Sequence, residues 1–145
     1  MLTFTDLIEE YSDELSKIDL ECFSTPWSCE SFMNEAKNEN ATYVIAHMDN
    51  EIIGYAGFWK VVDEGQITNI AVKKNYRGQG IGKKIVNDLI KKAKSQSVKS
   101  LTLEVRESII IAINLYSAFG FKKVGIRNNY YKNPLENAIL MDLKL

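Results

Sequence analysis

The chain is poor in the residues that mark several specialised classes of protein. Its 145 residues include two cysteines, two prolines and one histidine. Cys22 and Cys29 match neither a zinc-binding pattern nor a CxxC redox pair, so we expect two reduced thiols and no metal site. His47 lies in an apolar, strand-like run, which favours a surface or core role and gives little support to a histidine-based catalytic triad.

The chain also lacks a strong charge of either sign and a long apolar run. Its 18 basic and 19 acidic residues give a formal net charge of -1. Direct nucleic-acid binding normally requires a basic excess, so we do not expect it here. No apolar run reaches the roughly 20 residues that span a membrane, and the first residues do not resemble a signal peptide. We therefore expect a cytoplasmic, monomeric protein with one domain over residues 1–145.

Apolar periodicity predicts an alternation of helices and strands with no internal repeat or linker. The predicted helices cover residues 6–23, 29–37, 81–95 and 109–119, and Ser28 and Gly120 are their clearest caps. The predicted strands cover residues 42–48, 52–62, 66–73, 100–106, 121–131 and 138–143. One strand–helix–strand unit inside an otherwise antiparallel sheet indicates a mixed α/β fold with helices on both faces.

The most informative segment is the run Arg77-Gly78-Gln79-Gly80-Ile81-Gly82, which joins a predicted strand to a predicted helix. Glycines at such a turn leave backbone N–H groups uncovered at the positive end of the helix dipole, which suits an anionic phosphate. The run has neither the glycine spacing of a dinucleotide fingerprint nor the Gly-Lys-Ser/Thr ending of a P-loop. Of the lysines on the following helix, those nearest the glycines are candidates to hold phosphate, and the others form a solvated face.

Three segments in this order resemble the GNAT acetyltransferases: Ile70-Ala71-Val72, Arg77-x-x-Gly80-x-Gly82, and Leu115-Tyr116 followed by Gly120-Phe121. Further segments resemble the RimI branch of that family, the ribosomal-protein-alanine N-acetyltransferases. They are Pro26-Trp27-Ser28, Leu103-Glu104-Val105-Arg106-x-Ser108, Ala112-x-x-Leu115-Tyr116, Arg127-x-x-Tyr130-Tyr131 and Glu136-Asn137-Ala138-Ile139-x-Met141. The resemblance covers most of the chain.

The resemblance implies a GNAT fold, in which a mostly antiparallel central sheet splays open, and acetyl transfer from acetyl-CoA to an amine without a metal. In the RimI branch the amine is the N-terminal alanine of a small-subunit ribosomal protein. The pyrophosphate of CoA would lie on the glycine turn, and its pantetheine arm would pair with the splayed strand, whose free backbone groups suit an amide-rich arm. A backbone N–H near Ile70 or Ala71 would stabilise the oxyanion. The implied cofactor-binding residues are Ile70, Ala71, Val72, Arg77, Gly78, Gln79, Gly80, Ile81, Gly82 and Lys83.

An N-terminal amine needs only a modest base, because its pKa is about 7.7–8.0 against about 10.4 for lysine. Glu104, at the end of a predicted strand beside the expected splay, is the candidate base, acting directly or through water. Its alternative role is surface pairing with Arg106 or a lysine. Tyr116 matches the general acid of the family, which returns a proton to the CoA thiolate. Its alternative role is packing in the apolar stripe of its helix.

Three aromatic residues are candidates for substrate binding. Tyr130 and Tyr131 resemble positions that shape the peptide groove, and Trp27 is a further candidate; each has packing as its alternative role. The chain departs from the family at Ile109, where an asparagine usually helps to bind acetyl-CoA, because isoleucine has no side-chain hydrogen bond to offer. The alternatives for the whole protein are a GNAT enzyme for small amines or lysine, a non-catalytic acetyl-CoA-binding module, and a ping-pong enzyme that uses a cysteine.

Overall fold

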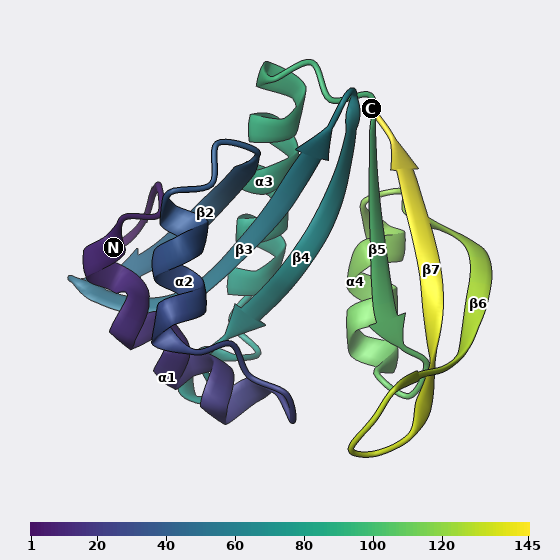
Figure 1. Ribbon diagram of the computed structural model, residues 1–145, viewed down its shortest axis with the longest axis horizontal. Helices are drawn as coiled ribbons and strands as arrows, with labels where there is room; N and C mark the ends of the chain where they lie inside the picture. The colour runs from purple at the N-terminus through teal and green to yellow at the C-terminus, as the bar shows by residue number, and fades with distance from the viewer.

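The computed structural model describes residues 1–145 and contains one seven-stranded sheet with helices on both faces (Figure 1). The strands are β1 (Leu2–Thr5), β2 (Ala41–Met48), β3 (Glu51–Val61), β4 (Glu64–Val72), β5 (Ser100–Arg106), β6 (Lys122–Tyr131) and β7 (Glu136–Lys144). The α-helices are α1 (Ser12–Cys22), α2 (Cys29–Ala36), α3 (Ile81–Ser95) and α4 (Ile110–Ala118). The strand order is β1-β2-β3-β4-β5-β7-β6, and only the pair β4–β5 is parallel. The predicted mixed fold is therefore confirmed.

Two apolar clusters hold the helices against opposite faces of this sheet. On one face, the predicted stripe of α3 is buried: Ile85, Leu89 and Ala93 are fully covered. On the other face, residues of α1 and α2 pack on aromatic and aliphatic side chains of β2 and β3. In Figure 1, α1 and α2 lie in front of the sheet and α3 and α4 behind it. Residues that alternate along each central strand therefore face two different cores.

The parallel strands β4 and β5 are paired along only part of their length. Their register runs from Glu64↔Ser100 to Gln66↔Thr102 and then stops. Beyond that point a register shift in the β3–β4 pairing leaves Thr68 as an extra residue of β4. Such a bulge bends the strand and increases its twist, which turns β4 away from β5. Figure 1 shows the two strands meeting at the top of the view and diverging towards the bottom.

The N-terminal segment differs from the prediction. The helix predicted from Asp6 was wrong at its start, because Ile8 is extended (φ -126, ψ 158) and α1 begins only at Ser12 after a short 3-10 turn. Residues 2–5, which carry no predicted element, form β1 and pair with β2 from Leu2↔Met48 to Thr5↔Ile45. Four residues are too few for hydrophobic alternation to predict a strand. This edge strand forms because β2 offers a free edge.

Most other predicted boundaries agree with the structure within two residues. Ser28 caps α2 as predicted, since its Oγ accepts a hydrogen bond from the N–H of Ser31 at 3.1 Å. Asp49 and Asn50 both have positive φ (49 and 74), which is the conformation of a two-residue hairpin turn. Gly120 follows α4 with φ 100, as a C-cap glycine does. None of the helices is both long and apolar enough to span a bilayer.

Candidate active site

The glycine turn precedes α3 and is open to ligands. Gly78 and Gly80 have φ of 79 and 78, and a Cβ added to either would meet no atom within 4 Å. Gly80 is the N-cap of α3 and offers no side-chain cap, so the first N–H groups of the helix have no partner from that residue. The empty space and the free N–H groups together fit an anionic group at the N-terminus of α3.

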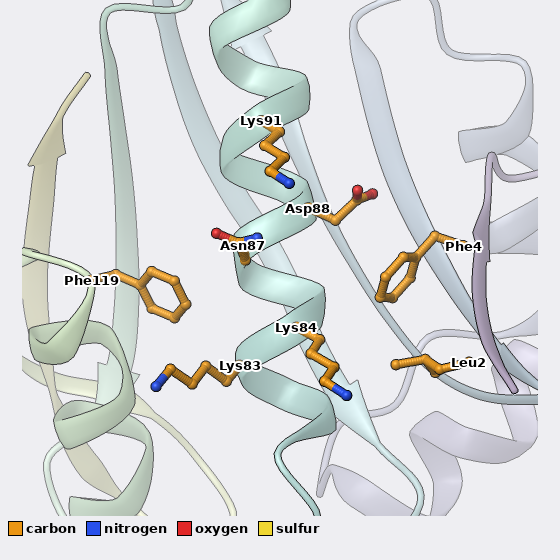
Figure 2. A pocket seen from close by; sticks show the side chains of 8 residues that line it. All are labelled: Leu2, Phe4, Lys83, Lys84, Asn87, Asp88, Lys91 and Phe119. Carbon is orange, nitrogen blue, oxygen red and sulfur yellow. The ribbon is translucent and has the colours of Figure 1, made fainter.

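A basic pocket lies on α3 beside this turn (Figure 2). Lys83 points from α3 towards Phe119 near the end of α4, whereas Lys84 points towards Leu2 of β1. The lining residues are Leu2, Phe4, Lys83, Lys84, Asn87, Asp88, Lys91 and Phe119. The lining contains three lysines and one aspartate, so the pocket has a positive electrostatic potential. An anionic ligand bound at the glycine turn could therefore extend into this pocket.

Arg77 contacts the protein itself. Its Nε donates to the carbonyl oxygen of Val72 at 3.0 Å, and its Nη2 donates to the Sγ of Cys22 at 3.1 Å. The side chain thereby ties the glycine turn to the end of β4 and to α1. The phosphate contact expected of Arg77 from the sequence stays a prediction, whereas its position at the base of the turn is a feature of the structure.

In β4, the backbone N–H and C=O groups of every second residue point into the gap between β4 and β5. The N–H of Lys73 donates to the carbonyl oxygen of Ile53 in β3 at 2.8 Å. Because backbone groups alternate in direction along a strand, the N–H of Ala71 also faces β3, and the groups of Ile70 and Val72 face the gap. The sequence left Ile70 and Ala71 as alternatives for an oxyanion donor, and this geometry favours Ile70.

Glu104 lies on β5 where the strand has left β4. Its neighbours Leu103 and Val105 are buried against α3 and α4, so Glu104 faces the opposite side of the sheet, where α1 and α2 lie. The carboxylate is 14% exposed, and its Oε1 is 3.6 Å from the Nε of Arg127. The alternative of pairing with Arg106 does not occur, because Arg106 pairs with Glu136.

Tyr116 is buried in α4, and its ring packs against Phe121 at 5.8 Å between centroids. No protein group bonds its hydroxyl, and the only fully buried side-chain polar atom without a partner is Ser12 Oγ, so the Tyr116 oxygen must reach accessible space. Burial raises the pKa of Tyr116 well above its usual value, and Tyr131 raises it further. The phenol is therefore protonated at any physiological pH and available as a proton donor.

Tyr131 lies within electrostatic reach of both candidate catalytic groups. Burial is the main cause that raises its pKa to about 12, and Tyr130 and Glu104 add to the effect. Tyr131 in turn raises the pKa of Tyr116. The sequence suggested Tyr131 only as a groove residue. Its position near Glu104 and Tyr116 depends on how β6 and β7 pair, which no local pattern in the sequence reveals.

The other two aromatic candidates, Tyr130 and Trp27, are partly exposed. Tyr130 is 47% exposed, and its ring meets Tyr131 edge-on at 5.0 Å. Trp27 packs on Phe32 at 5.4 Å between ring centroids, and its backbone N–H donates to Asp19 Oδ2 at 3.0 Å. Trp27 is therefore half-buried at the edge of the α1–α2 core, and a groove role would involve only its exposed part.

Comparison with known proteins assigns this arrangement to a family. Residues 6–121 match the model of the acetyltransferase (GNAT) family. The chain belongs to the GNAT acetyltransferases. It is an acetyl-CoA-dependent N-acetyltransferase, and its splayed β4–β5 pair and glycine turn are the features expected from the family resemblance of the sequence.

Several relatives that resemble this GNAT enzyme along nearly their whole length are named as ribosomal protein bS18-alanine N-acetyltransferases. The chain is 37% identical over 134 residues to the ribosomal protein bS18-alanine N-acetyltransferase of Haemophilus influenzae, covering 89% of each chain. It is 34% identical over 148 residues to the enzyme of that name from Escherichia coli, covering 99% of this chain and 95% of that one. The crystal structure of the Escherichia coli enzyme superposes with a TM-score of 0.92 at 32% identity, covering 99% and 94% of the two chains.

Cys22 is poorly suited to carry an acetyl group in this GNAT enzyme. Burial is the main cause that raises the pKa of Cys22, which lowers the thiolate fraction at neutral pH. We expect a Cys22→Ser/Cys29→Ala double variant to keep its acetylation rate within about twofold of the wild type, since serine preserves a polar contact for Arg77. A steady-state assay measures this, and an inactive, folded double variant would support the ping-pong alternative.

Proposed function

We propose that this GNAT enzyme acetylates the α-amino group of a protein N-terminus, namely the N-terminal alanine of ribosomal protein bS18. The observation that carries the proposal is the near full-length similarity to two enzymes of that name at 34% and 37% identity. The geometry supports the same chemistry. The Glu104 carboxylate and the Tyr116 phenol are both within electrostatic reach of Tyr131, and the backbone of Ile70 and Val72 lines the adjacent gap between β4 and β5.

The residues of this chain fit acetyl-CoA along one continuous path. We place its phosphates on the glycine turn, with the N–H groups of Gly78–Lys83 and the charge of Lys83 as partners. We place its pantetheine arm along Ile70 and Val72, where the outward backbone groups of Ile70 and the N–H of Val72 would bind it as an added strand, while the carbonyl oxygen of Val72 already accepts from Arg77. Acetyl-CoA supplies the activated acetyl group when bound, and the N–H of Ile70 would stabilise negative charge on the acetyl oxygen.

Two side chains would move protons. Glu104 would accept the proton of the attacking amine, directly or through one water molecule, because its carboxylate is 14% exposed beside the gap. Tyr116 would donate its phenolic proton to the departing sulfur, since burial keeps the phenol protonated. Both groups act in one complex of enzyme, donor and amine, so that no acetyl group is carried on the protein.

Intact-mass spectrometry of peptides incubated with enzyme and acetyl-CoA tests the proposal. We expect a mass gain of one acetyl group on a peptide with the N-terminal sequence of bS18, and no gain on the same peptide with a blocked N-terminus and a free lysine. Faster turnover of polyamines or other small amines than of any peptide would refute a protein substrate. Cofactor binding without any transfer would instead support a non-catalytic module.

Ile109 gives a separate prediction about the donor site. It is the N-cap residue of α4, its side chain is 44% exposed, and it makes no capping hydrogen bond. Ile109→Asn is expected to stabilise the fold by about 1 kcal/mol through capping. It is also expected to tighten acetyl-CoA binding up to about tenfold through one added hydrogen bond.

Thermal unfolding and isothermal titration calorimetry measure the two effects of Ile109→Asn separately. Ile111→Asn is the matched control, because Ile111 is 86% exposed in the same helix and lies past the cap position. Equal acetyl-CoA affinity in the wild type and Ile109→Asn would show that the departure from the family at this position has no consequence for the donor.

A further inference from the structure

Arg106 makes a set of contacts that no catalytic role accounts for. It is the last residue of β5, two positions beyond Glu104 and on the same face, and its side chain is only 18% exposed. Nη1 donates to the carbonyl oxygen of Pro134 at 3.0 Å and to Glu136 Oε1 at 3.1 Å. Nη2 donates to Ser24 Oγ at 3.2 Å. A half-buried arginine with this many partners fixes the positions of all of them.

The contact with Ser24 crosses the split in the sheet. Ser24 lies in the α1–α2 loop, which belongs to the half of the molecule built on β1 to β4. Arg106 belongs to the half built on β5 to β7, and these two halves share only three paired positions, at the opposite end of β4 and β5. Figure 1 shows the α1–α2 loop reaching towards the lower ends of β5 and β7. The Arg106–Ser24 bond therefore connects the halves where the strands are farthest apart.

The same guanidinium lies over the ring of Tyr131, with 4.4 Å between Cζ and the ring centroid. A cation stacked on an aromatic face restrains the orientation of the ring. Tyr131 lies within electrostatic reach of Glu104 and Tyr116, so this restraint acts beside the proposed proton-transfer groups. Glu136, the ion-pair partner of Arg106, also accepts the N–H of Ser108 at 2.7 Å, just before α4.

We propose that Arg106 is a positioning residue for the amine substrate. By holding the α1–α2 loop, Tyr131 and the β6–β7 turn together, it shapes the substrate end of the gap between β4 and β5. None of its contacts involves Ile70, Val72 or the glycine turn, where the donor is placed. The inference rests on the proposed function, and it predicts that binding of the peptide depends on Arg106 whereas binding of acetyl-CoA does not.

Two substitutions test this role: one removes a single contact of Arg106, and the other removes several. Ser24→Ala removes only the bond across the split, at an exposed loop position that leaves the fold intact. Arg106→Lys keeps the charge and can keep the Glu136 pair, but an ammonium cannot serve Ser24, Pro134 and the ring of Tyr131 together. Ser95→Ala is the matched control, since its hydroxyl makes one local bond to the carbonyl oxygen of Lys92 in α3.

The steady-state KM and kcat for an N-terminal peptide and the Kd for acetyl-CoA give the decisive comparison. We expect Ser24→Ala to raise the peptide KM about three- to tenfold, as for one lost hydrogen bond, and Arg106→Lys to raise it more. Both should leave the acetyl-CoA Kd within twofold of the wild type, and Ser95→Ala should change neither quantity. An unchanged peptide KM in both variants, or a parallel weakening of acetyl-CoA binding, would overturn the inference.

Hydrogen exchange of the free protein gives a readout that does not need activity. Amides of residues 23–25, 27 and 28 should exchange faster in Ser24→Ala and Arg106→Lys, while those of α3 should keep the wild-type rates. Unchanged exchange in the loop would overturn the inference by itself. A wild-type protein that acetylates no N-terminal peptide would refute the proposed function, and the exchange result would still decide whether Arg106 holds the loop.

Discussion

Glu104→Gln should lower kcat/KM for an N-terminal peptide by about 10²- to 10⁴-fold, the usual contribution of a positioned general base. Glutamine has nearly the same size and shape, so the 14%-exposed site beside Arg127 stays filled. The amide cannot accept a proton at neutral pH, and the amine must then lose its proton to solvent before it attacks. The residual rate of the variant should rise with pH through the α-amine pKa of about 8, as the wild-type rate does, but from a much lower level.

The matched control for Glu104→Gln is Glu107→Gln, which changes an exposed carboxylate three residues along the same segment. We expect this control to keep the wild-type kcat/KM. Calorimetry should give the same acetyl-CoA Kd for both variants, because neither side chain lies on the Ile70–Val72 edge or at the glycine turn. If Glu104→Gln kept kcat/KM within about threefold of the wild type, Glu104 would not be the base.

Tyr116→Phe should lower kcat by about 10²-fold or more, since it removes the proposed proton donor to the thiolate. The loss should come with little change in stability. The hydroxyl bonds no protein group, and phenylalanine preserves the packing of the ring against Phe121. Pre-steady-state acetyl transfer at saturating acetyl-CoA measures the effect on chemistry, and thermal unfolding checks the fold. Tyr11→Phe is the control, because the Tyr11 ring packs on His47, outside the gap.

The pH profile adds an independent check on Tyr116. Burial raises the pKa of Tyr116, so its protonated and active form persists as the pH rises, while the substrate α-amine loses its proton near pH 8. The wild-type rate should increase to about pH 8 and then stay level to about pH 10, without a descending limb. A fall in rate between pH 8 and pH 10 in a protein that remains folded would argue against a buried phenol as the acid.

The sequence was enough to predict those parts of the site that depend only on neighbouring residues. The glycine turn needs only glycines between a strand and a helix, and the stripe of Ile85, Leu89 and Ala93 buries α3 at helical spacing. The alternation of residues along β5 is sufficient to place Glu104 on the face opposite Leu103 and Val105. These features persist because helix and strand geometry depend on the order of neighbouring residues.

The other features of the site depend on contacts between segments that are far apart in the sequence. The strand β1 exists because β2 has a free edge. Tyr131 comes within electrostatic reach of Glu104 and Tyr116 because β6 pairs with β7, with a shift of register between Arg127 and Tyr131. The link from Arg106 to Ser24 joins positions 82 residues apart. The chain alone thus specified a glycine turn proposed to bind phosphate and the candidate acid and base, since both follow from short-range patterns and family resemblance. Only the folded molecule showed how the open end of the sheet is held, because contacts between distant segments depend on the twist and register of the whole sheet.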